Sequence, residues 1–272
     1  MPELPEVQSV VNYFKPLLAK EQISKITSPN NYVKVFNTHS ISKINSITKG
    51  LIINDVFRRG KYIVLDLSKG YLCIHLRMTG QLQMDINEAD SLKHYSFAIF
   101  FKSGKSVYFK DYRKFGRVYY YKDLDILNHK LGVEPLSSEF NYEFLLTSIK
   151  RSNGMIKPFL LNQKHIAGLG NIYIDESLWL SKIHPKKISS SISKPKIEIL
   201  SEAIPKILTQ AIEFNGTTII NFSYGNQVAG DFKQFLNVFG KQGEPCPRCK
   251  AKLKKIFVTQ RGTHYCPSCQ KL

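Results

Sequence analysis

The first part of the chain changes its hydrophobic period once, near residue 20. Over residues 4–18 apolar side chains recur every three or four positions, which predicts an amphipathic helix, and Pro16 should kink or shorten its last turn. From about residue 23 to 121 the pattern becomes short β-branched and aromatic runs, at 51–57, 62–67, 72–76, 96–101, 107–109 and 118–121. Gly60, Gly70, Gly80 and Gly104 mark turns or bulges between them. Many strands with one flanking helix predict a β-sandwich.

Helical spacing returns in the second half, over 141–151, 155–163, 171–181 and 196–214, with Gly216 after the last helix. The stretch Gly132-Val-Glu-Pro135 is typical of a linker, and residues 223–231 are poor in apolar side chains, as a mobile loop would be. We therefore expect an α+β multidomain protein. Its parts would be a sandwich over 1–131, a helical domain over 132–240 and a cysteine module over 241–272.

The charge of the chain favours a polyanionic partner. Lys and Arg number 39 against 21 Asp and Glu, which gives a net charge of +18 and a pI near 9.6. Self-repulsion of this size destabilises a lone fold, so nucleic acid is the natural partner, although a compositional bias of the genome would give the same excess. A hydrophobic fraction of 43% excludes a disordered chain.

The sequence offers no route to a membrane or to secretion. No stretch approaches the roughly 20 apolar residues that a membrane span needs. Glu3, Glu6, Lys15 and Lys20 interrupt the region where a signal peptide would have its apolar core. We expect an intracellular protein, so its five cysteines should not form disulfides, and Cys73 should be a buried core thiol.

The other four cysteines form the strongest metal signal. They stand in two Cys-x-x-Cys pairs, Cys246 with Cys249 and Cys266 with Cys269. Two such knuckles complete a tetrahedral thiolate site for one Zn²⁺, and the residues between them can form a hairpin. Four thiolates leave no open coordination position, so the zinc should be structural. Arg261, at the expected hairpin turn, is the functional candidate here, although an arginine in a turn is usually only a solvated charge.

The amino terminus carries a second candidate chemistry. If Met1 is removed, Pro2 becomes a free secondary amine, which condenses with an aldehyde carbon to give a cationic iminium. Glu3 is close enough to move protons at the same carbon. The simpler interpretation is an ordinary helix start, where Pro and acidic residues are both favoured.

Several uncommon motifs occur in order along almost the whole chain. They are Pro2-Glu3-Leu4-Pro5-Glu6-Val7, Arg58-Arg59-Gly60-Lys61-Tyr62, His75-Leu76-Arg77-Met78, Arg113-Lys114-Phe115-Gly116, Ile156-Lys157-Pro158, Ala167-Gly168-Leu169-Gly170-Asn171-Ile172-Tyr173 and the cysteine module with Arg261-Gly262-Thr263. This set resembles the bacterial formamidopyrimidine-DNA glycosylases. The resemblance implies a DNA base-excision-repair enzyme, both glycosylase and abasic-site lyase, acting on oxidised purines in duplex DNA. It implies a sandwich, a helix–two-turn–helix domain and a zinc finger, in a cytoplasmic, nucleoid-associated monomer without a nucleotide cofactor.

The resemblance also assigns roles to residues. Pro2 would attack C1′ of the damaged nucleotide and form the Schiff base, with Glu3 and Lys61 as proton donors and Arg261 on the phosphates around the flipped nucleotide. The implied DNA contacts are Glu6, His75, Met78, His94, Arg113, Phe115, Lys157 and Asn171. Met78, Arg113 and Phe115 would fill the space that the flipped base leaves. Taken alone, Met78 and Phe115 would be core residues, Lys157 a solvated charge and the two histidines structural.

The chain departs from the family pattern in a few places. Tyr112 stands where many members have a small residue or proline, and Phe239 replaces a common tyrosine, which puts one phosphate hydrogen bond in doubt. The loop 223–231 would cap the lesion without deciding which base is preferred. Two alternatives stay open: the same fold acting mainly on oxidised pyrimidines, and a catalytically silent protein that binds damaged DNA.

Overall fold

The computed structural model describes residues 1–84, 86, 92–217 and 230–272. The chain forms two compact units, one of Met1–Asn128 with the described part of Asn215–Asp231, the other of His129–Phe214 and Phe232–Leu272. No helix among the described residues is long and apolar enough to span a bilayer.

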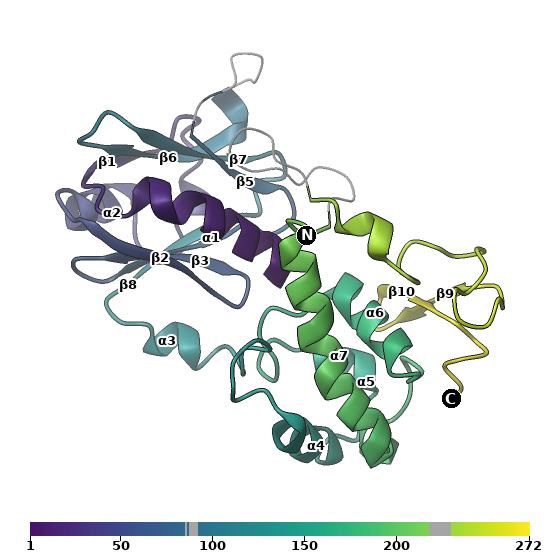
Figure 1. Ribbon diagram of the computed structural model, residues 1–272. Helices are drawn as coiled ribbons and strands as arrows, with labels where there is room; N and C mark the ends of the chain where they lie inside the picture. Colours follow the sequence, from purple (N-terminus) through teal and green to yellow (C-terminus); the bar gives the residue numbers. More distant parts are fainter. Residues whose placement is uncertain (85, 87–91, 218–229) are drawn as a thin grey trace. The chain divides into compact units, whose positions relative to one another are not determined.

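The first unit is a sandwich of two four-stranded antiparallel sheets (Figure 1). One sheet has the order β2-β3-β4-β8 and the other β1-β6-β7-β5. The strands are β1 Ile23–Thr27, β2 Ile53–Arg59, β3 Tyr62–Leu67, β4 Tyr71–His75, β5 Gly80–Gln83, β6 Tyr95–Phe101, β7 Ser106–Asp111 and β8 Arg117–Tyr121. The predicted β-sandwich is confirmed. Gly80 opens a strand where we predicted a turn or bulge, since its amide closes the turn at Leu76.

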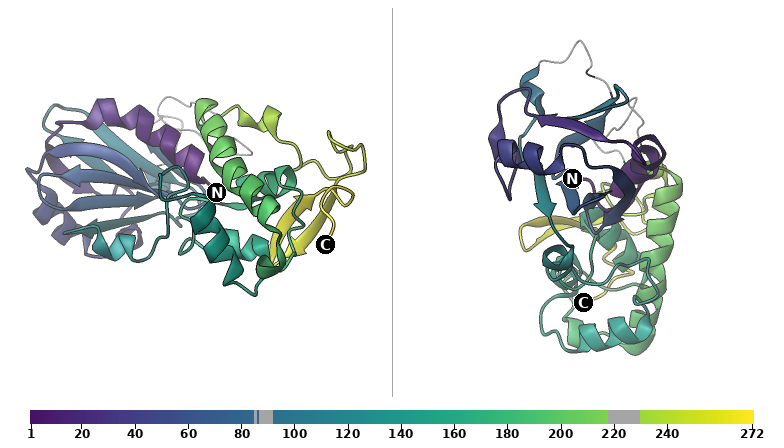
Figure 2. Two further views of the ribbon diagram at one scale, coloured as in Figure 1. Left: turned by 60° about the horizontal axis from the view of Figure 1, so that its bottom comes forward. Right: turned by 90° about the vertical axis from the view of Figure 1, so that its left-hand side faces the viewer.

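Helix α1 (Leu4–Leu18) places its apolar stripe on this core. Val7, Val10 and Phe14 are fully buried with side chains from both sheets, as the helical spacing predicts. The helix itself lies alongside the strands of the sandwich (Figures 1 and 2). Pro16 lies inside the helix, which still reaches Leu18. Cys73 is fully buried, as predicted. The helices α2 (Ile41–Thr48) and α3 (Asp125–Asn128) were not predicted.

The second unit is helical and ends in a β-hairpin. Its elements are α4 Tyr142–Lys150, α5 Ile156–Leu161, α6 Asn171–Leu180, α7 Lys194–Glu213, β9 Lys254–Val258 and β10 Arg261–Tyr265. Short 3-10 turns lie at Val33–Val35, Leu92–His94, Ser189–Ser191 and Phe232–Phe235. Helix α6 has buried side chains on all sides, because α5, α7 and β10 surround it. The stretch predicted as a linker is anchored in this unit, since Val133 forms a β-bridge with Ile166.

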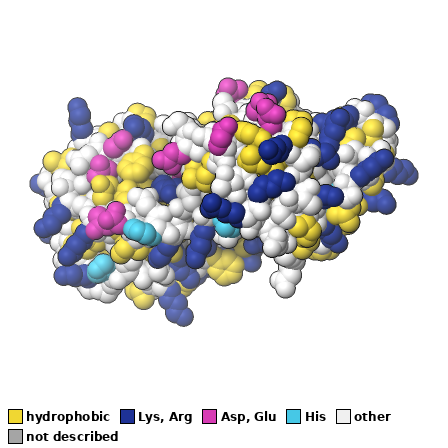
Figure 3. Space-filling view, turned by 90° about the horizontal axis from the view of Figure 1, so that it is seen from below, with side chains coloured by type: hydrophobic (Ala, Val, Ile, Leu, Met, Phe, Trp, Pro, Cys, Tyr) yellow, Lys and Arg dark blue, Asp and Glu magenta, His cyan; other side chains and the backbone are white. Residues whose placement is uncertain are grey.

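Lys and Arg side chains are spread widely over the face shown in Figure 3, and acidic side chains lie among them in fewer places. The structure thus distributes the positive charge over the surface instead of confining it to one element.

Candidate active site and nucleic-acid interface

The start of α1 is organised by two buried carboxylates. The Glu6 carboxylate accepts the Glu3 amide at 2.7 Å, and the Glu3 carboxylate accepts the Glu6 amide in return. This reciprocal capping box fixes both acids beside Pro2, which is itself buried. Met1 is 53% exposed, and while it is present the Pro2 nitrogen is an amide. Only removal of Met1 would make that nitrogen a nucleophile.

Glu6 has a second task in the same unit. Its other carboxylate oxygen accepts the Thr217 amide at 2.7 Å. Gly216, next to it, has φ +81°, and a Cβ there would come within 2.6 Å of the Glu6 carboxylate. Glu6 therefore links the start of α1 to residues 216–217, directly before the segment predicted to cap the lesion. That segment lies at 223–229 outside the described residues, and only Gly230 and Asp231 are described.

Lys61 lies in the two-residue turn between β2 and β3, where it was predicted, and its side chain is buried. Tyr62 follows it and pairs across the sheet with His75, their rings meeting edge to face at 4.7 Å. Burial, together with the nearby charges of Arg77 and Lys61, lowers the pKa of His75 to about 3. His75 is therefore neutral near pH 7.

The neutral His75 ring also shapes the next loop. Its Nδ1 accepts the Arg77 amide at 3.0 Å, so the proton of the neutral ring must be on Nε2. Arg77 takes a left-handed backbone conformation, φ 55°, and Met78 follows with 45% of its surface exposed. His75 thus has the structural role that we left open, and its Nε2–H is a donor that carries no charge.

Met78, Arg113 and Phe115 meet in one exposed cluster, which we call the wedge cluster. The Arg113 guanidinium donates to the Met78 sulfur at 3.1 Å and lies 4.7 Å from the Phe115 ring centroid. Met78 and Phe115 are both 45% exposed, so assigning them to the core would have been wrong. The structure brings these three predicted residues together from two loops.

A buried aspartate that sequence reasoning missed supports this cluster. Asp111 is 1% exposed and accepts the Arg113 amide at 3.2 Å, the Gly116 amide at 2.7 Å and the Thr79 hydroxyl. The Thr79 hydroxyl also accepts the Arg113 amide. Asp111 thus joins the Met78 loop to the 112–116 loop. An acid two positions before Arg113 is typical of a side-chain-capped turn, and that signal was available.

The rings of His94 and Tyr112 pack at a tilt beside this loop, with their centroids 4.6 Å apart. The Lys110 ammonium lies 4.9 Å from the Tyr112 ring on the same unit. Tyr112, one of the two departures, is 44% exposed, so it adds an aromatic surface next to the wedge cluster.

The four cysteines gather as predicted in the second unit. The sulfur atoms of Cys246, Cys249, Cys266 and Cys269 all lie within 4.8 Å of one another. One Zn²⁺ with four Zn–S bonds of about 2.3 Å fits a set this close, and an all-thiolate donor set selects zinc. The module binds one structural zinc ion.

The hairpin that carries Arg261 has an unusual turn. Thr259 and Gln260 form its two-residue loop, and both have positive φ, 45° and 62°. Asn-Gly is the usual choice there, and a β-branched residue at positive φ is strained. Arg261 follows as the first residue of β10, with its side chain exposed.

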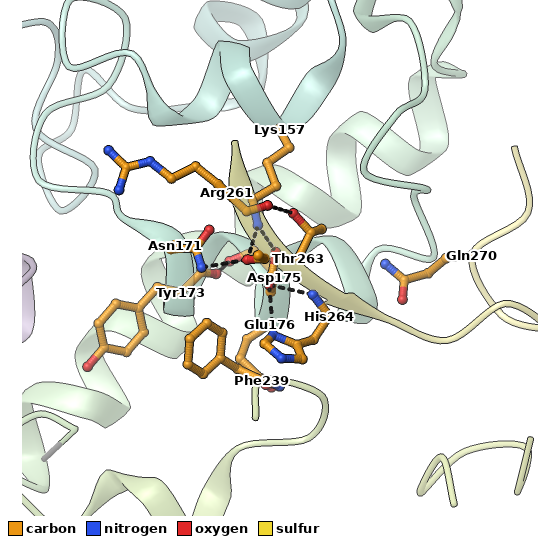
Figure 4. Close-up of polar contacts among 12 residues, drawn as sticks. Lys157, Asn171, Tyr173, Asp175, Glu176, Phe239, Arg261, Thr263, His264 and Gln270 are labelled. Atoms are coloured by element: carbon orange, nitrogen blue, oxygen red, sulfur yellow. Dashed lines mark hydrogen bonds and ion pairs between the residues drawn. The ribbon is translucent and has the colours of Figure 1, made fainter. Parts of the chain in front are cut away.

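Asn171 and Lys157 contact this hairpin from the helices (Figure 4). The Asn171 amide group donates to the Gly262 carbonyl at 2.8 Å, and the Lys157 ammonium reaches the same oxygen at 3.5 Å. Lys157 is 0% exposed and forms an ion pair with Asp175 at 2.5 Å, so it is not the solvated charge that its position suggested. Its predicted contact with DNA phosphate stays a prediction.

Glu176, next to Asp175 on α6, anchors a different segment. Its carboxylate accepts the amides of Asn237, Val238 and Phe239 at 2.8–2.9 Å. Phe239, the second departure from the family pattern, packs edge to face on His264 at 4.8 Å. Its ring therefore supports β10 (Figure 4). Asp175 and Glu176 carried no motif or period that would have marked them.

Comparison with known proteins gives matches over the whole chain. Residues 1–118 match the formamidopyrimidine-DNA glycosylase N-terminal domain, residues 131–223 its H2TH domain, and residues 243–272 the zinc finger found in FPG and IleRS. The formamidopyrimidine-DNA glycosylase of Pelotomaculum thermopropionicum is 40% identical, with 100% of both chains covered. That of Lactobacillus helveticus is 39% identical over 99% of both. A Lactococcus lactis FPG variant in complex with a Fapy-dG containing DNA has a TM-score of 0.91, with 34% identity over both full chains.

Proposed function

Because the chain belongs to the formamidopyrimidine-DNA glycosylase family, we propose that it excises oxidised purines, 8-oxoguanine and formamidopyrimidines, from duplex DNA and then cleaves the abasic site. Its substrate is damaged double-stranded DNA, and its zinc ion is structural. We place it in the bacterial cytoplasm with the nucleoid, as a monomer that needs no nucleotide cofactor.

The wedge cluster is the observation that supports this proposal most. An exposed methionine and phenylalanine with an arginine between them are costly in water and have the shape and chemistry to enter a base stack. Filling the stack allows the damaged nucleotide to leave it, which chemistry at C1′ requires. The arginine can donate to the base that is left without a partner.

The chemistry proposed for the amino terminus begins after removal of Met1. The Pro2 nitrogen attacks C1′, the glycosidic bond breaks, and the base leaves with that electron pair and takes up a proton. Glu3 protonates the ring oxygen as the sugar opens, and the C1′–nitrogen bond becomes an iminium. Loss of a C2′ proton then expels the 3′ phosphate, a second elimination expels the 5′ phosphate, and water releases the sugar from Pro2.

The remaining predicted residues serve that site. We assign Lys61 as a further proton donor and phosphate contact, and Arg261 as the finger's phosphate contact in the second elimination. His75, His94, Lys157 and Asn171 contact the DNA backbone, and Glu6 orients the amino terminus. The capping box supports this assignment, because it holds Glu3 and Glu6 at fixed positions beside Pro2.

Borohydride reduction tests the nucleophile directly. Chain without Met1 is incubated with an 8-oxoguanine duplex and borohydride, digested, and analysed by mass spectrometry. We expect the sugar on the peptide that begins with Pro2, in the wild type, in the Lys61→Ala variant and in a Pro5→Ala control. An adduct on a lysine, or full activity in chain that retains Met1, would overturn the assignment.

One observation favours a broader substrate range. A solved Lactococcus lactis FPG with a TM-score of 0.90 and 34% identity is in complex with an oxidized pyrimidine containing DNA. Cleavage rates on 8-oxoguanine, formamidopyrimidine and oxidised-pyrimidine duplexes, each opposite C or A, measure the preference of this chain. Faster cleavage of the pyrimidine lesions would select the alternative substrate class, and tight binding without cleavage of any duplex would show a silent binding protein.

A further inference from the structure

We infer that Asp175 is a positioning residue for Arg261: through Lys157 and strand β10 it sets where the finger arginine stands. The inference rests on the proposed function, because it takes Arg261 as a phosphate contact. Asp175 is fully buried on α6, and it is neither exposed to DNA nor a zinc ligand.

Three residues in a row after Arg261 are tethered (Figure 4). The Gly262 carbonyl accepts the Asn171 amide group and the Lys157 ammonium, at 2.8 and 3.5 Å. The Thr263 hydroxyl, itself buried, donates to the Arg261 carbonyl at 2.8 Å. The His264 amide donates to the second oxygen of Asp175 at 2.8 Å. The backbone that leaves Arg261 is therefore fixed from the α6 side.

Asp175 takes part in two of these four contacts, directly at His264 and through Lys157 at Gly262. One of its oxygens holds the Lys157 ammonium at 2.5 Å and directs it toward the Gly262 carbonyl, and the other holds β10 directly. Lys157 comes from α5, so Asp175 joins α5, α6 and the hairpin in a single buried contact.

The energetics favour a role in geometry over one in stability. Both partners of the ion pair are 0% exposed, and a buried pair gains little net stability because both ions lose their hydration. Its directional contacts, in contrast, hold the strand in position. On its other side Arg261 follows the Thr259–Gln260 turn, in which both residues have strained positive φ values. The direction of Arg261 thus depends on the Asp175 end.

A double-mutant cycle tests this inference by DNA affinity. The wild type, Asp175→Asn, Arg261→Ala and the double variant are titrated with a duplex that contains a tetrahydrofuran abasic analogue, over a series of salt concentrations. Arg261→Ala should weaken binding about tenfold and reduce the slope of log affinity against log salt by about 1, the loss of one phosphate contact. Asp175→Asn alone should weaken binding roughly three- to tenfold. In the Arg261→Ala background it should change neither quantity.

The controls separate positioning from folding. Each variant must bind one zinc ion per chain. Gln270→Ala is the matched control, because Gln270 is buried and anchors the finger at the Ile183 carbonyl and the Cys266 amide, beyond the end of β10. Its effect should be the same with and without Arg261. If Asp175→Asn loses zinc, Asp175→Glu replaces it, because it keeps the charge opposite Lys157 and displaces both carboxylate oxygens. The same loss of effect in the Arg261→Ala background is expected.

The outcomes are distinguishable. An equal loss of affinity from Asp175→Asn with and without Arg261 overturns the positioning role alone. An Arg261→Ala variant with unchanged affinity and salt slope overturns the proposed role of Arg261 and this inference with it.

Discussion

The loops of two exposed arginines in this chain are each held by a buried aspartate, which we call the support of that arginine. The donors to one aspartate are neutral, and those to the other include a charged group. Arg113, in the sandwich unit, rests on Asp111, whose donors are two backbone amides and the Thr79 hydroxyl. Arg261, in the helical unit, rests on Asp175, whose donors are the His264 amide and the Lys157 ammonium.

The difference follows from the backbone amides that each segment has available for a carboxylate. The loop of Arg113 turns back on itself, so its own amides can satisfy a carboxylate. A β-strand has its amides committed to its partner strand, so β10 leaves fewer donors for Asp175, and a lysine from another helix supplies the rest. We therefore expect the two supports to respond differently to removal of zinc, to substitution of their aspartates and to acidic pH.

Loss of zinc should have the largest effect, and only on the Arg261 support. A chelator should unfold the finger, because the bonds from one ion to the four cysteines hold it together. Incision of an 8-oxoguanine duplex should be abolished, and added Zn²⁺ should restore it. Limited proteolysis followed by mass spectrometry should show residues 243–272 cleaved and the sandwich intact. Full incision by metal-free protein would contradict a role for the finger.

Asp175→Ala should have the second-largest effect, because it leaves a buried charge without its partner. The variant leaves Lys157 buried without its counter-ion, which typically costs about 3–5 kcal/mol of unfolding free energy. Replacing both partners by apolar residues, as in Lys157→Met/Asp175→Leu, should cost much less. Urea unfolding of the variants measures both values. Equal losses in the single and double variants would mean that the charge of Lys157 is not what matters.

Asp111→Ala should cost less, about 2–3 kcal/mol, because it removes the acceptor of neutral donors, the Gly116 amide and the Thr79 hydroxyl, and strands no charge. It should also weaken binding of an abasic-analogue duplex, since the two loops that carry the wedge cluster lose the carboxylate that joins them. Asp111→Asn keeps one acceptor oxygen and should recover part of both losses. Asp123→Ala, on the exposed surface of the same unit, is the control: it removes the acceptor of one exposed amide, that of Asp125, so it should cost about 1 kcal/mol or less and leave DNA binding unchanged. A cost for Asp111→Ala as large as that for Asp175→Ala would remove the distinction between the supports.

These aspartates also mark where sequence reasoning stopped. The pattern of apolar residues predicted α1, six of the strands and the four helices of the second unit, because each buries a periodic face. The tips of the loops, Met78, Arg113, Phe115 and Arg261, were found through family motifs. Asp111 and Asp175 were not. Asp111 offered a local signal that was not used, an acid two positions before Arg113, whereas the donors of Asp175 lie 18 and 89 residues away at Lys157 and His264, and no local pattern records them. Lys157 was found, but its burial was not.

Acidic pH should lower the stability of the sandwich unit through His75. Its pKa in the folded chain is about 3 against an ordinary value of 6.5, so below pH 6.5 the unfolded chain binds the extra proton. The contribution of His75 to the free energy of unfolding is therefore fully present above pH 6.5. It is lost as the pH falls, by up to about 1.4 kcal/mol per pH unit. Urea unfolding between pH 6.5 and 5 measures the slope. The slope should be shallower in His75→Gln, and an unchanged slope would show that His75 does not titrate as its burial requires.

Relief of strain in the finger turn should give the smallest effect, and in the opposite direction. Thr259→Asn with Gln260→Gly places the residues that a turn with two positive φ values prefers, so the hairpin should gain about 1 kcal/mol. If Asp175 already fixes Arg261 from the other end, DNA affinity should not change. Thermal unfolding and titration of the abasic-analogue duplex measure the two quantities. A gain in affinity would mean that the direction of Arg261 is set by its turn as well, and the buried aspartate would then be only half of its support.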